Sequence, residues 1–356
     1  MTSMAIPSTP VDVPDAPPIP GLTFRTGRMP DDWAPLAEIV SAVRLADGEA
    51  EVATAEYLAA DWGNLEAWDG GRDLLLAEVD GRLVGFSTGQ ARMRDGALVI
   101  DTWGGVLPEM RRRRLGTALH HWARAHFRDG TDAHPEAATR HYRTWALEQE
   151  VGDIALFEQE GFVPIRYGFE MRRFLTGTLP EHPLPEGLEL RPVRDQDLRT
   201  ILVGEDEAFQ DHWGHHPMTE DDIRSVLEFP ETDPSLWQVA WDGDEVAGVV
   251  QNYIFTAENA QLDLRRGWLE RVSVRRPWRG RGLAKALCAA SFRVLRERGM
   301  DEAWLGVDGA NPTGALQLYE GLGFMVSRRW QAYGRPLDGP APAGWTGSAT
   351  TTESQP

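Results

Sequence analysis

The sequence has very little cysteine or lysine and no long apolar run. Cys288 is the only cysteine and Lys285 the only lysine among 356 residues, which excludes an intramolecular disulfide and a metal site built on several cysteines. No segment approaches the ~20 apolar residues that a membrane-spanning helix needs. The first 20 residues lack both a basic start and an apolar core. We therefore expect a cytoplasmic protein with no signal peptide and no membrane partner.

Acidic residues outnumber basic ones, 55 to 36, so the formal net charge is −19. Such a surface repels nucleic acid and anionic membranes, so neither is expected as a partner. It suits cationic or amine-bearing small molecules instead. A hydrophobic content of 42% is ordinary for globular proteins, and the length predicts two domains.

An internal repeat with an offset of roughly 165 residues organises the chain. Its matching pairs, in order, are 21–31 with 187–197, 79–86 with 242–249, 106–119 with 274–287, and Gly161-Phe162 with Gly323-Phe324. The order of the matches indicates a tandem duplication. The expected parts are a disordered tail (1–20), an N-terminal domain (21–178), a Pro-rich linker (179–187), a C-terminal domain (188–336) and a second disordered tail (337–356).

Apolar periodicity predicts an α/β arrangement in the C-terminal copy. Strands are expected at about 188–193, 236–241, 245–256, 267–274, 302–308 and 324–334, and helical segments at about 195–229, 281–298 and 313–321. Gly299 is placed as a C-terminal helix cap, and Asn311-Pro312 as the start of the last helix.

The loop between the strand ending at Val274 and the helix beginning near Gly282 is rich in glycine and arginine. A helix N-terminus offers unpaired N–H groups and partial positive charge, and glycine lets a phosphate approach the backbone. The loop therefore predicts a pyrophosphate site, the alternative being a turn that binds no ligand. It matches neither the dinucleotide fingerprint nor the P-loop.

Two motifs carry a resemblance to a known family. Arg279-x-x-Gly282-x-Ala284 resembles the [QR]-x-x-G-x-[GA] signature of the GCN5-related N-acetyltransferase (GNAT) superfamily. The segment from Asn311 through Tyr319 to Gly323-Phe324 is similar to its closing motif. The resemblance covers roughly 21–336, and the duplication resembles that of mycothiol acetyltransferases and similar two-copy members. It implies two tandem GNAT folds, each a mixed, mostly antiparallel sheet with flanking helices.

The resemblance also implies acetyl-CoA as co-substrate, with no metal. Backbone amides of residues 280–284 would hold the pyrophosphate, and an amide such as that of Val272 would stabilise negative charge on the thioester oxygen. The full set of expected coenzyme-binding residues is Val272, Val274, Arg279, Gly280, Arg281, Gly282, Leu283, Ala284, Lys285 and Asn311.

Two residues are candidates for proton transfer. By the resemblance, Tyr319 would protonate the departing thiolate, the alternative being a tyrosine that only packs. Glu270 has the strand parity of Val272 and Val274, which makes it the candidate base. Many family members place a carboxylate two residues earlier, where this chain has Trp268, and a solvated or ion-paired Glu270 is the alternative.

Acceptor binding is expected from the first helices of the C-terminal copy. Asp211, His212 and Trp213 are the candidate residues there, and Asn252 and Tyr253, before the strand over 267–274, are further candidates. The neighbouring histidines raise the alternative of a metal site, although no cysteine or spaced carboxylate set accompanies them. Ordinary packing and capping is the other alternative.

The N-terminal copy has lost these features. Arg112 and Arg114 stand where Gly280 and Gly282 stand in the other copy, and Phe157 replaces Tyr319. We expect this domain to have no catalytic activity and to form one side of the acceptor site. Its arginines could still bind a coenzyme, and the sequence leaves both alternatives open.

The sequence thus predicts an N-acyltransferase that moves acetyl from acetyl-CoA to a primary amine of a small molecule by direct attack in a ternary complex. A monomer or a weak homodimer is expected. The alternative is a non-catalytic sensor or scaffold that binds acyl-CoA, and the sequence does not name the acceptor.

Overall fold

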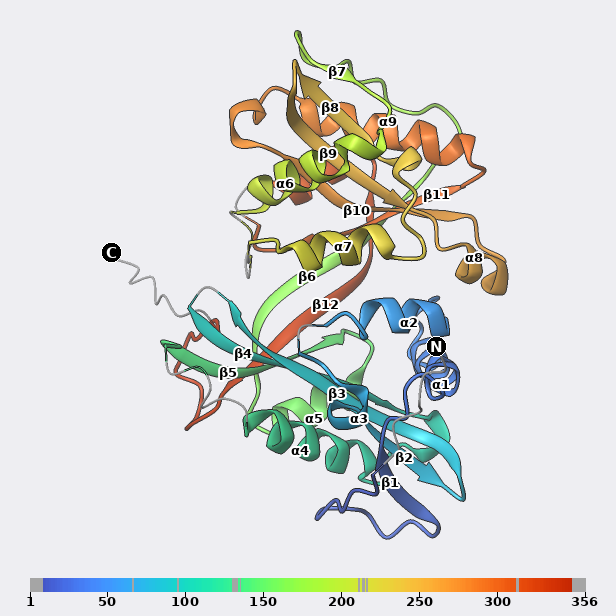
Figure 1. Cartoon of the computed structure of the whole chain (residues 1–356), viewed down its shortest axis with the longest axis vertical. Coiled ribbons are helices and arrows are strands. Elements are labelled where there is room, and N and C mark those ends of the chain that lie inside the picture. The colour runs from blue at the N-terminus through green and yellow to red at the C-terminus, as the bar shows by residue number, and fades with distance from the viewer. Residues whose placement is uncertain are drawn as a thin grey trace. The chain divides into compact units, whose positions relative to one another are not determined.

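The computed structural model describes residues 9–65, 67–94, 96–129, 134, 136–210, 212, 215, 217–311 and 314–347. The chain divides into two compact units (Figure 1). Unit 1 holds Met1–Arg166 together with Gln331–Pro356, and unit 2 holds Tyr167–Trp330. No helix in the described ranges is long and apolar enough to cross a membrane.

Unit 1 alternates helices with strands of a mixed sheet. Its elements are β1 (Leu22–Thr26), α1 (Trp33–Ala46), α2 (Ala55–Asp61), α3 (Gly70–Asp73), β2 (Leu75–Val79), β3 (Arg82–Arg94), β4 (Ala97–Val106), α4 (Leu115–Arg128), β5 (Thr139–Leu147) and α5 (Val151–Gln159). The strand order is β1-β2-β3-β4-β5, followed by the end of β12 (Met325–Pro336). β4 and β5 are parallel, whereas β1, β2, β3 and β4 pair antiparallel in turn.

Unit 2 repeats this arrangement. After β6 (Val163–Phe174) its elements are β7 (Glu189–Leu190), α6 (Leu198–Phe209), α7 (Glu220–Glu228), β8 (Gln238–Asp242), β9 (Glu245–Tyr253), α8 (Thr256–Leu262), β10 (Arg266–Val274), α9 (Leu283–Glu297), β11 (Glu302–Asp308), α10 (Ala315–Gly321) and the start of β12. The strand order is β6-β11-β10-β9-β8-β7, and only β10 and β11 are parallel among its described pairs. A mixed, mostly antiparallel strand arrangement with flanking helices in each unit confirms the expected fold class.

The two units do not coincide with the two sequence repeats, because β6 and β12 each run from one unit into the other. In unit 2, residues 168–174 of β6 pair antiparallel with β11. In unit 1, Tyr333 of β12 is buried with its ring 5.7 Å from that of Phe157. Each repeat therefore contributes its last strand to the other unit.

The segments expected as linker and tails take part in packing. Leu179 and Leu188, at the edges of the expected linker, are buried in the core of unit 2. Val13 belongs to the core of unit 1, and so does Leu337. The ring of Trp345 lies 5.4 Å from that of His141. Described residues of both expected tails thus pack against unit 1, where the sequence predicted disorder.

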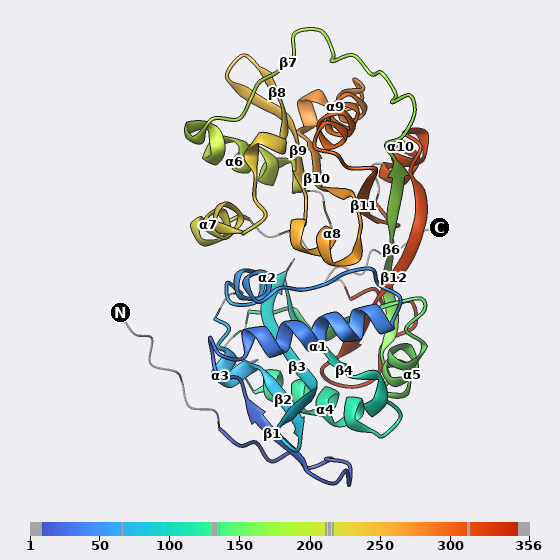
Figure 2. The ribbon, with the colours of Figure 1, turned by 90° about the vertical axis from the view of Figure 1, so that its right-hand side faces the viewer.

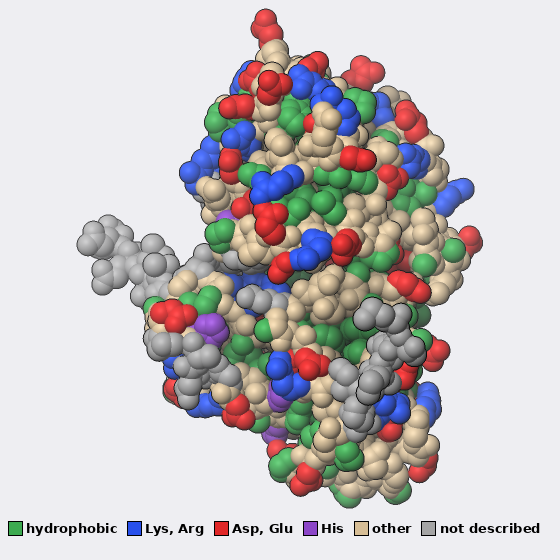
Figure 3. Space-filling model, viewed as in Figure 1, with side chains coloured by type: hydrophobic (Ala, Val, Ile, Leu, Met, Phe, Trp, Pro, Cys, Tyr) green, Lys and Arg blue, Asp and Glu red, His purple; other side chains and the backbone are tan. Residues whose placement is uncertain are grey.

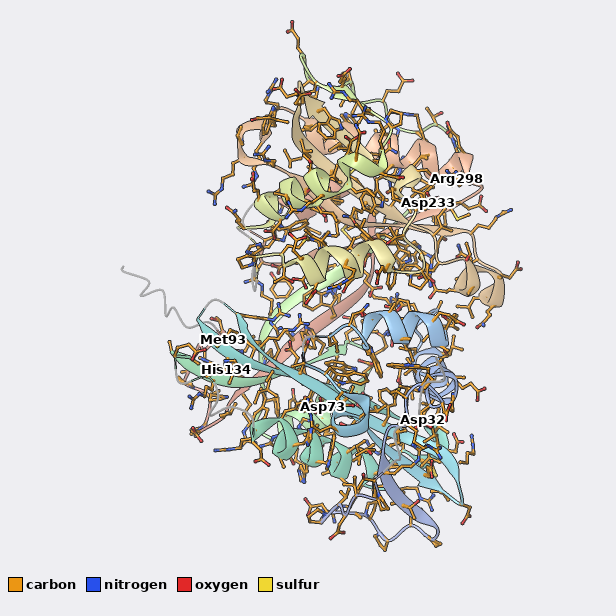
Figure 4. The ribbon with its side chains drawn as sticks, viewed as in Figure 1. Asp32, Asp73, Met93, His134, Asp233 and Arg298 are labelled. Carbon is orange, nitrogen blue, oxygen red and sulfur yellow. The ribbon has the colours of Figure 1, made fainter. Side chains whose placement is uncertain are left out.

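Helices cover both faces of the sheet in unit 2 (Figure 2). On β9, Val249 packs in the core that contains Ile201 of α6, whereas Val250 packs in the core that contains Leu287 of α9. β9 is buried at all but its first residue, as expected for a strand covered on both faces. Beyond the end of α9, Arg298 pairs with Asp233 at 3.2 Å and fixes the segment before β8 (Figure 4).

The expected elements of unit 2 are confirmed within a few residues, with two differences. The expected strand over 245–256 ends at Tyr253, and α8 follows it. The last helix begins at Ala315 with Gly314 as its N-cap, so Asn311-Pro312 was the wrong start. Gly299, with a φ of 84°, does end α9: its N–H donates to the Arg296 carbonyl and the N–H of Met300 to the Leu295 carbonyl.

Candidate active site

The central feature of unit 2 is the separation of two parallel strands. β10 and β11 pair at three positions, the last being Trp268 with Trp304. Beyond that point β11 remains paired with β6, and β10 with β9, up to the ends of both strands. Beyond this point the backbone N–H and C=O groups that β10 and β11 turn toward each other do not pair with each other. Because buried backbone donors and acceptors need partners, these groups can bind a ligand.

A β-bulge lies just beyond this point. The register between β9 and β10 shifts between Leu269 and Arg271, which makes Glu270 the extra residue. Leu269 and Val272 consequently pack in the same core with α9, although they are three positions apart. Glu270 is exposed. Burial raises the pKa of Tyr253, and the charges of Glu205 and Glu270 add to that shift. The parity argument that grouped Glu270 with Val272 was therefore wrong, because the bulge moves Glu270 to the opposite face.

The glycine loop after β10 leads into α9 as expected. Gly282 is the N-cap of α9, with a φ of 87°, and Gly280 has a φ of 74°. A Cβ at either position would meet no atom within 4 Å. The first N–H groups of α9 have no intrahelical acceptor. Open space before a helix N-terminus fits a diphosphate, so the loop satisfies the requirement of the coenzyme site.

Side chains of the loop hold its shape. Arg279 donates from Nε to the Val274 carbonyl and from Nη2 to the Ala208 carbonyl, both at 2.9 Å. Arg281 donates to the Glu186 carbonyl at 3.1 Å. Arg279 thus braces the loop, and its terminal nitrogens are not all available to a ligand.

The remaining candidate coenzyme residues differ in exposure. Leu283 is buried, which leaves only its backbone for a ligand, whereas Lys285 is exposed and Ala284 half-buried. Val272 and Val274 are half-buried on β10. Asn311 follows β11, where its N–H donates to the Asp308 carbonyl at 3.2 Å.

Tyr319 lies on α10 and packs in the core that contains α9. Burial raises the pKa of its hydroxyl far above the ordinary value, so the hydroxyl stays protonated. Among the described residues no side chain or carbonyl bonds this hydroxyl. Nearby Cys288 is fully buried, which raises the pKa of its thiol to about 12 and removes it as a nucleophile.

The expected acceptor residues are only partly described. Asp211 and Trp213 lie outside the described residues. The ring of His212 lies 4.5 Å from that of Phe209. Tyr253 is buried, and its hydroxyl donates to Gln251 Oε1 at 3.1 Å. In the described part of the chain no group of His, Cys, Asp or Glu is arranged to hold a metal.

A buried polar network beside the bulge was missed from the sequence. Glu205 of α6 is fully buried, which raises the pKa of its carboxyl. It accepts a hydrogen bond from Gln251 Nε2 at 2.7 Å, and Arg271 Nε lies 2.9 Å from its other oxygen. A signal was available: Glu205 follows Ile201 by four residues and so interrupts the apolar face of α6.

Unit 1 keeps the separated strands but not their surroundings. Pairing of β4 with β5 ends at Asp101 and Arg143, which form a buried ion pair. Arg143 donates from Nε to Asp101 Oδ1 at 2.7 Å and from Nη2 to Asp101 Oδ2 at 2.9 Å. The matching position of unit 2 holds Trp268 and Trp304, with ring centroids 5.7 Å apart. β3 and β4 pair without a register shift, so this unit lacks the bulge.

The arginine loop of unit 1 keeps the backbone of the glycine loop. Arg112 and Arg114 have φ values of 60° and 66°, and Arg114 is the N-cap of α4 as Gly282 is of α9. Phe157 is buried beside His120, whose pKa burial lowers to about 3. The turn before α4 therefore has the same backbone conformation as the glycine turn before α9, but it carries arginine side chains where the glycine turn exposes its backbone.

Replacing Arg114 with glycine should stabilise unit 1 by about 1 kcal/mol, because a left-handed conformation costs a non-glycine residue ~1–2 kcal/mol, and the greater flexibility of unfolded glycine offsets part of the gain. Urea unfolding of the full chain measures this. Arg113, which has no positive φ, is the matched control: Arg113→Gly should be destabilising. A destabilised Arg114→Gly protein would refute the strained turn.

Comparisons with known proteins agree with this geometry. Residues 198–324 match the family described as Acetyltransferase (GNAT) family. A mycothiol acetyltransferase of Nocardiopsis dassonvillei is 32% identical over 328 residues, which cover 84% of this chain and 92% of the relative. That of Thermobifida fusca is 30% identical over 330 residues, 86% of this chain and 95% of the relative.

Solved structures share the two-unit architecture. A GCN5-related N-acetyltransferase from Sphaerobacter thermophilus aligns with a TM-score of 0.70 and 28% identity, over 92% of this chain and 98% of that one. A tandem GNAT protein from the clavulanic acid biosynthesis pathway, at 18% identity and a TM-score of 0.64, covers 90% of this chain and all of its own, and shows the fold alone. The chain belongs to the GNAT family of N-acetyltransferases, and its relatives include mycothiol acetyltransferases.

Proposed function

We propose that unit 2 transfers an acetyl group from acetyl-CoA to a primary amine of a small molecule, with both substrates bound at once. The observation that carries this proposal is the continuity of β10, which leaves β11 after Trp268 and runs into the open glycine turn at the N-terminus of α9. An acyl-pantetheine arm along β10 would meet the unpaired strand edge, and its diphosphate would meet the turn.

The coenzyme would be held mainly by backbone. The N–H groups of residues 280–284 would bond the pyrophosphate, and the helix dipole of α9 adds favourable charge. Arg279 would act by bracing the turn. Val272, Val274, Arg281, Lys285 and Asn311 complete the proposed contacts.

The chemical step is direct acyl transfer. The amine nitrogen attacks the thioester carbon, the new C–N bond forms, and the C–S bond breaks as the sulfur leaves. An amide of β10 such as that of Val272 would stabilise the charge on the carbonyl oxygen. Tyr319 would give its proton to the sulfur, and Glu270 would take the amine proton through water. The position of Glu270 on the face opposite α9 supports this role, because α9 would border the coenzyme.

Unit 1 would have no catalytic part. Its turn carries Arg112 and Arg114 in place of open backbone, and Phe157 has no proton to give. The Asp101–Arg143 ion pair occupies the point where its strands separate, and breaking a buried pair is costly. These features support a structural role for unit 1.

Titration calorimetry with acetyl-CoA, followed by thiol release across a panel of primary amines, tests the proposal. We expect one binding site per chain, and thiol release that depends on the amine. Binding without thiol release for every amine would favour an acyl-CoA sensor. Two sites per chain would contradict the expected single site and would mean that unit 1 also binds the coenzyme.

A further inference from the structure

Arg271 is held in one orientation beside the bulge of β10. Its Nε lies 2.9 Å from an oxygen of Glu205, which has no exposed surface. Its guanidinium carbon lies 4.7 Å from the centre of the Phe209 ring. An ion pair at Nε and a ring beneath the plane restrict the side chain, so little freedom is lost when the guanidinium binds a ligand.

Among the described residues, the terminal nitrogens of this guanidinium donate no hydrogen bond to a protein atom. Its one ion-pair partner in this part of the chain is Glu205, which Nε contacts. About a third of the side chain is exposed. Arginine presents its terminal N–H groups as a planar fork that matches a carboxylate or a phosphate.

The location of Arg271 relates it to the acceptor. Arg271 pairs across the sheet with Gln251, and both side chains reach Glu205 of α6. The glycine turn and Tyr319, by contrast, belong to the side of the sheet covered by α9. If the coenzyme binds on the α9 side as proposed, an amine would reach the thioester from the α6 side. Arg271 is there, one residue after the proposed base Glu270.

We propose that the acceptor amine carries a negatively charged group, a carboxylate or a phosphate, and that the terminal nitrogens of Arg271 bind it. This inference rests on the proposed acetyl transfer by unit 2. The chain has a net charge of −19, and charges of both signs are interspersed on the face shown in Figure 3. An anionic acceptor is repelled by the molecule as a whole and therefore needs a local cation.

Two matched pairs of amines test the inference: β-alanine against β-alaninamide, and O-phosphoethanolamine against ethanolamine. Calorimetry on the coenzyme A-loaded protein measures binding of each, and thiol release measures kcat/KM. We expect the anionic member of at least one pair to be favoured by about 10- to 100-fold, the range of a hydrogen bond to a charged group. The pair that shows the preference identifies carboxylate or phosphate as the bound group.

Arg271→Gln should reduce that preference to less than about 3-fold, while the affinity and kcat/KM for the neutral amines stay unchanged. Arg224→Gln, which removes an exposed arginine of α7, is the matched control. It should leave the affinity and kcat/KM for both amines of each pair unchanged. Glu205→Gln should raise KM for the anionic amine with little effect on kcat, because Glu205 is a positioning residue for Arg271. If Arg271→Gln does not fold, Glu205→Gln supplies the test.

Equal binding of both members in both pairs, or an equal loss for both in Arg271→Gln, would overturn the inference and leave acetyl transfer standing. Absence of acetyl-CoA binding to the wild-type protein would instead overturn the proposed function.

Discussion

Gly282→Arg should lower the affinity for coenzyme A by about 100-fold or more, equivalent to ~3 kcal/mol. Gly282 stands where the first free N–H groups of α9 begin, and the space beyond its Cα holds no protein atom within 4 Å. A side chain there would occupy the position proposed for the diphosphate. Calorimetry with coenzyme A gives the affinity directly.

The chain itself shows that the substituted turn can fold. Arg114 adopts a φ of 66° at the matching position of unit 1, so Gly282→Arg should cost only ~1–2 kcal/mol of stability. Gly282→Ala separates the two effects, because it brings the same backbone strain with a single added carbon and should weaken binding less. Affinity retained in folded Gly282→Arg protein would show that the diphosphate lies elsewhere.

The sequence predicted the coenzyme loop well because its structure is local. A strand ending at Val274, a glycine with positive φ and an amphipathic helix follow one another along the chain, and short-range preferences determine each of them. The same holds for Gly299, whose capping bonds join residues only a few positions apart.

Features that depend on distant residues were not predictable in this way. The exchange of β6 and β12 between the units has no signal in the local sequence, because each strand would have the same residue pattern if it stayed in the unit of its own repeat. The bulge at Glu270 adds one residue to a strand whose side chains otherwise alternate between the two faces of the sheet. A strict period of two therefore placed Glu270 on the same face as Val272, which was wrong. The network around Glu205 joins α6, β9 and β10, which only the folded sheet brings together.

Tyr319→Phe should lower turnover by about 100-fold, the usual size of general acid catalysis, with little change in coenzyme affinity. The hydroxyl has no partner among the described residues, and burial keeps it protonated because the pKa is raised far above the ordinary value. The phenol therefore carries its proton at any working pH, and transfer of that proton to sulfur depends on the basicity of the departing thiolate. Thiol release gives kcat, and calorimetry gives the affinity for coenzyme A.

The stability of the protein separates a catalytic from a packing role for Tyr319. Removing a hydroxyl that bonds no described residue should cost little free energy of unfolding, because no partner is left unsatisfied. Tyr253→Phe, which breaks a bond to Gln251 at 3.1 Å, should cost ~1 kcal/mol and is the contrasting variant. A Tyr319→Phe protein with unchanged turnover for every active amine would remove Tyr319 from the mechanism. Turnover lost in proportion to stability would assign it to packing, because a proton donor affects the rate without affecting the fold.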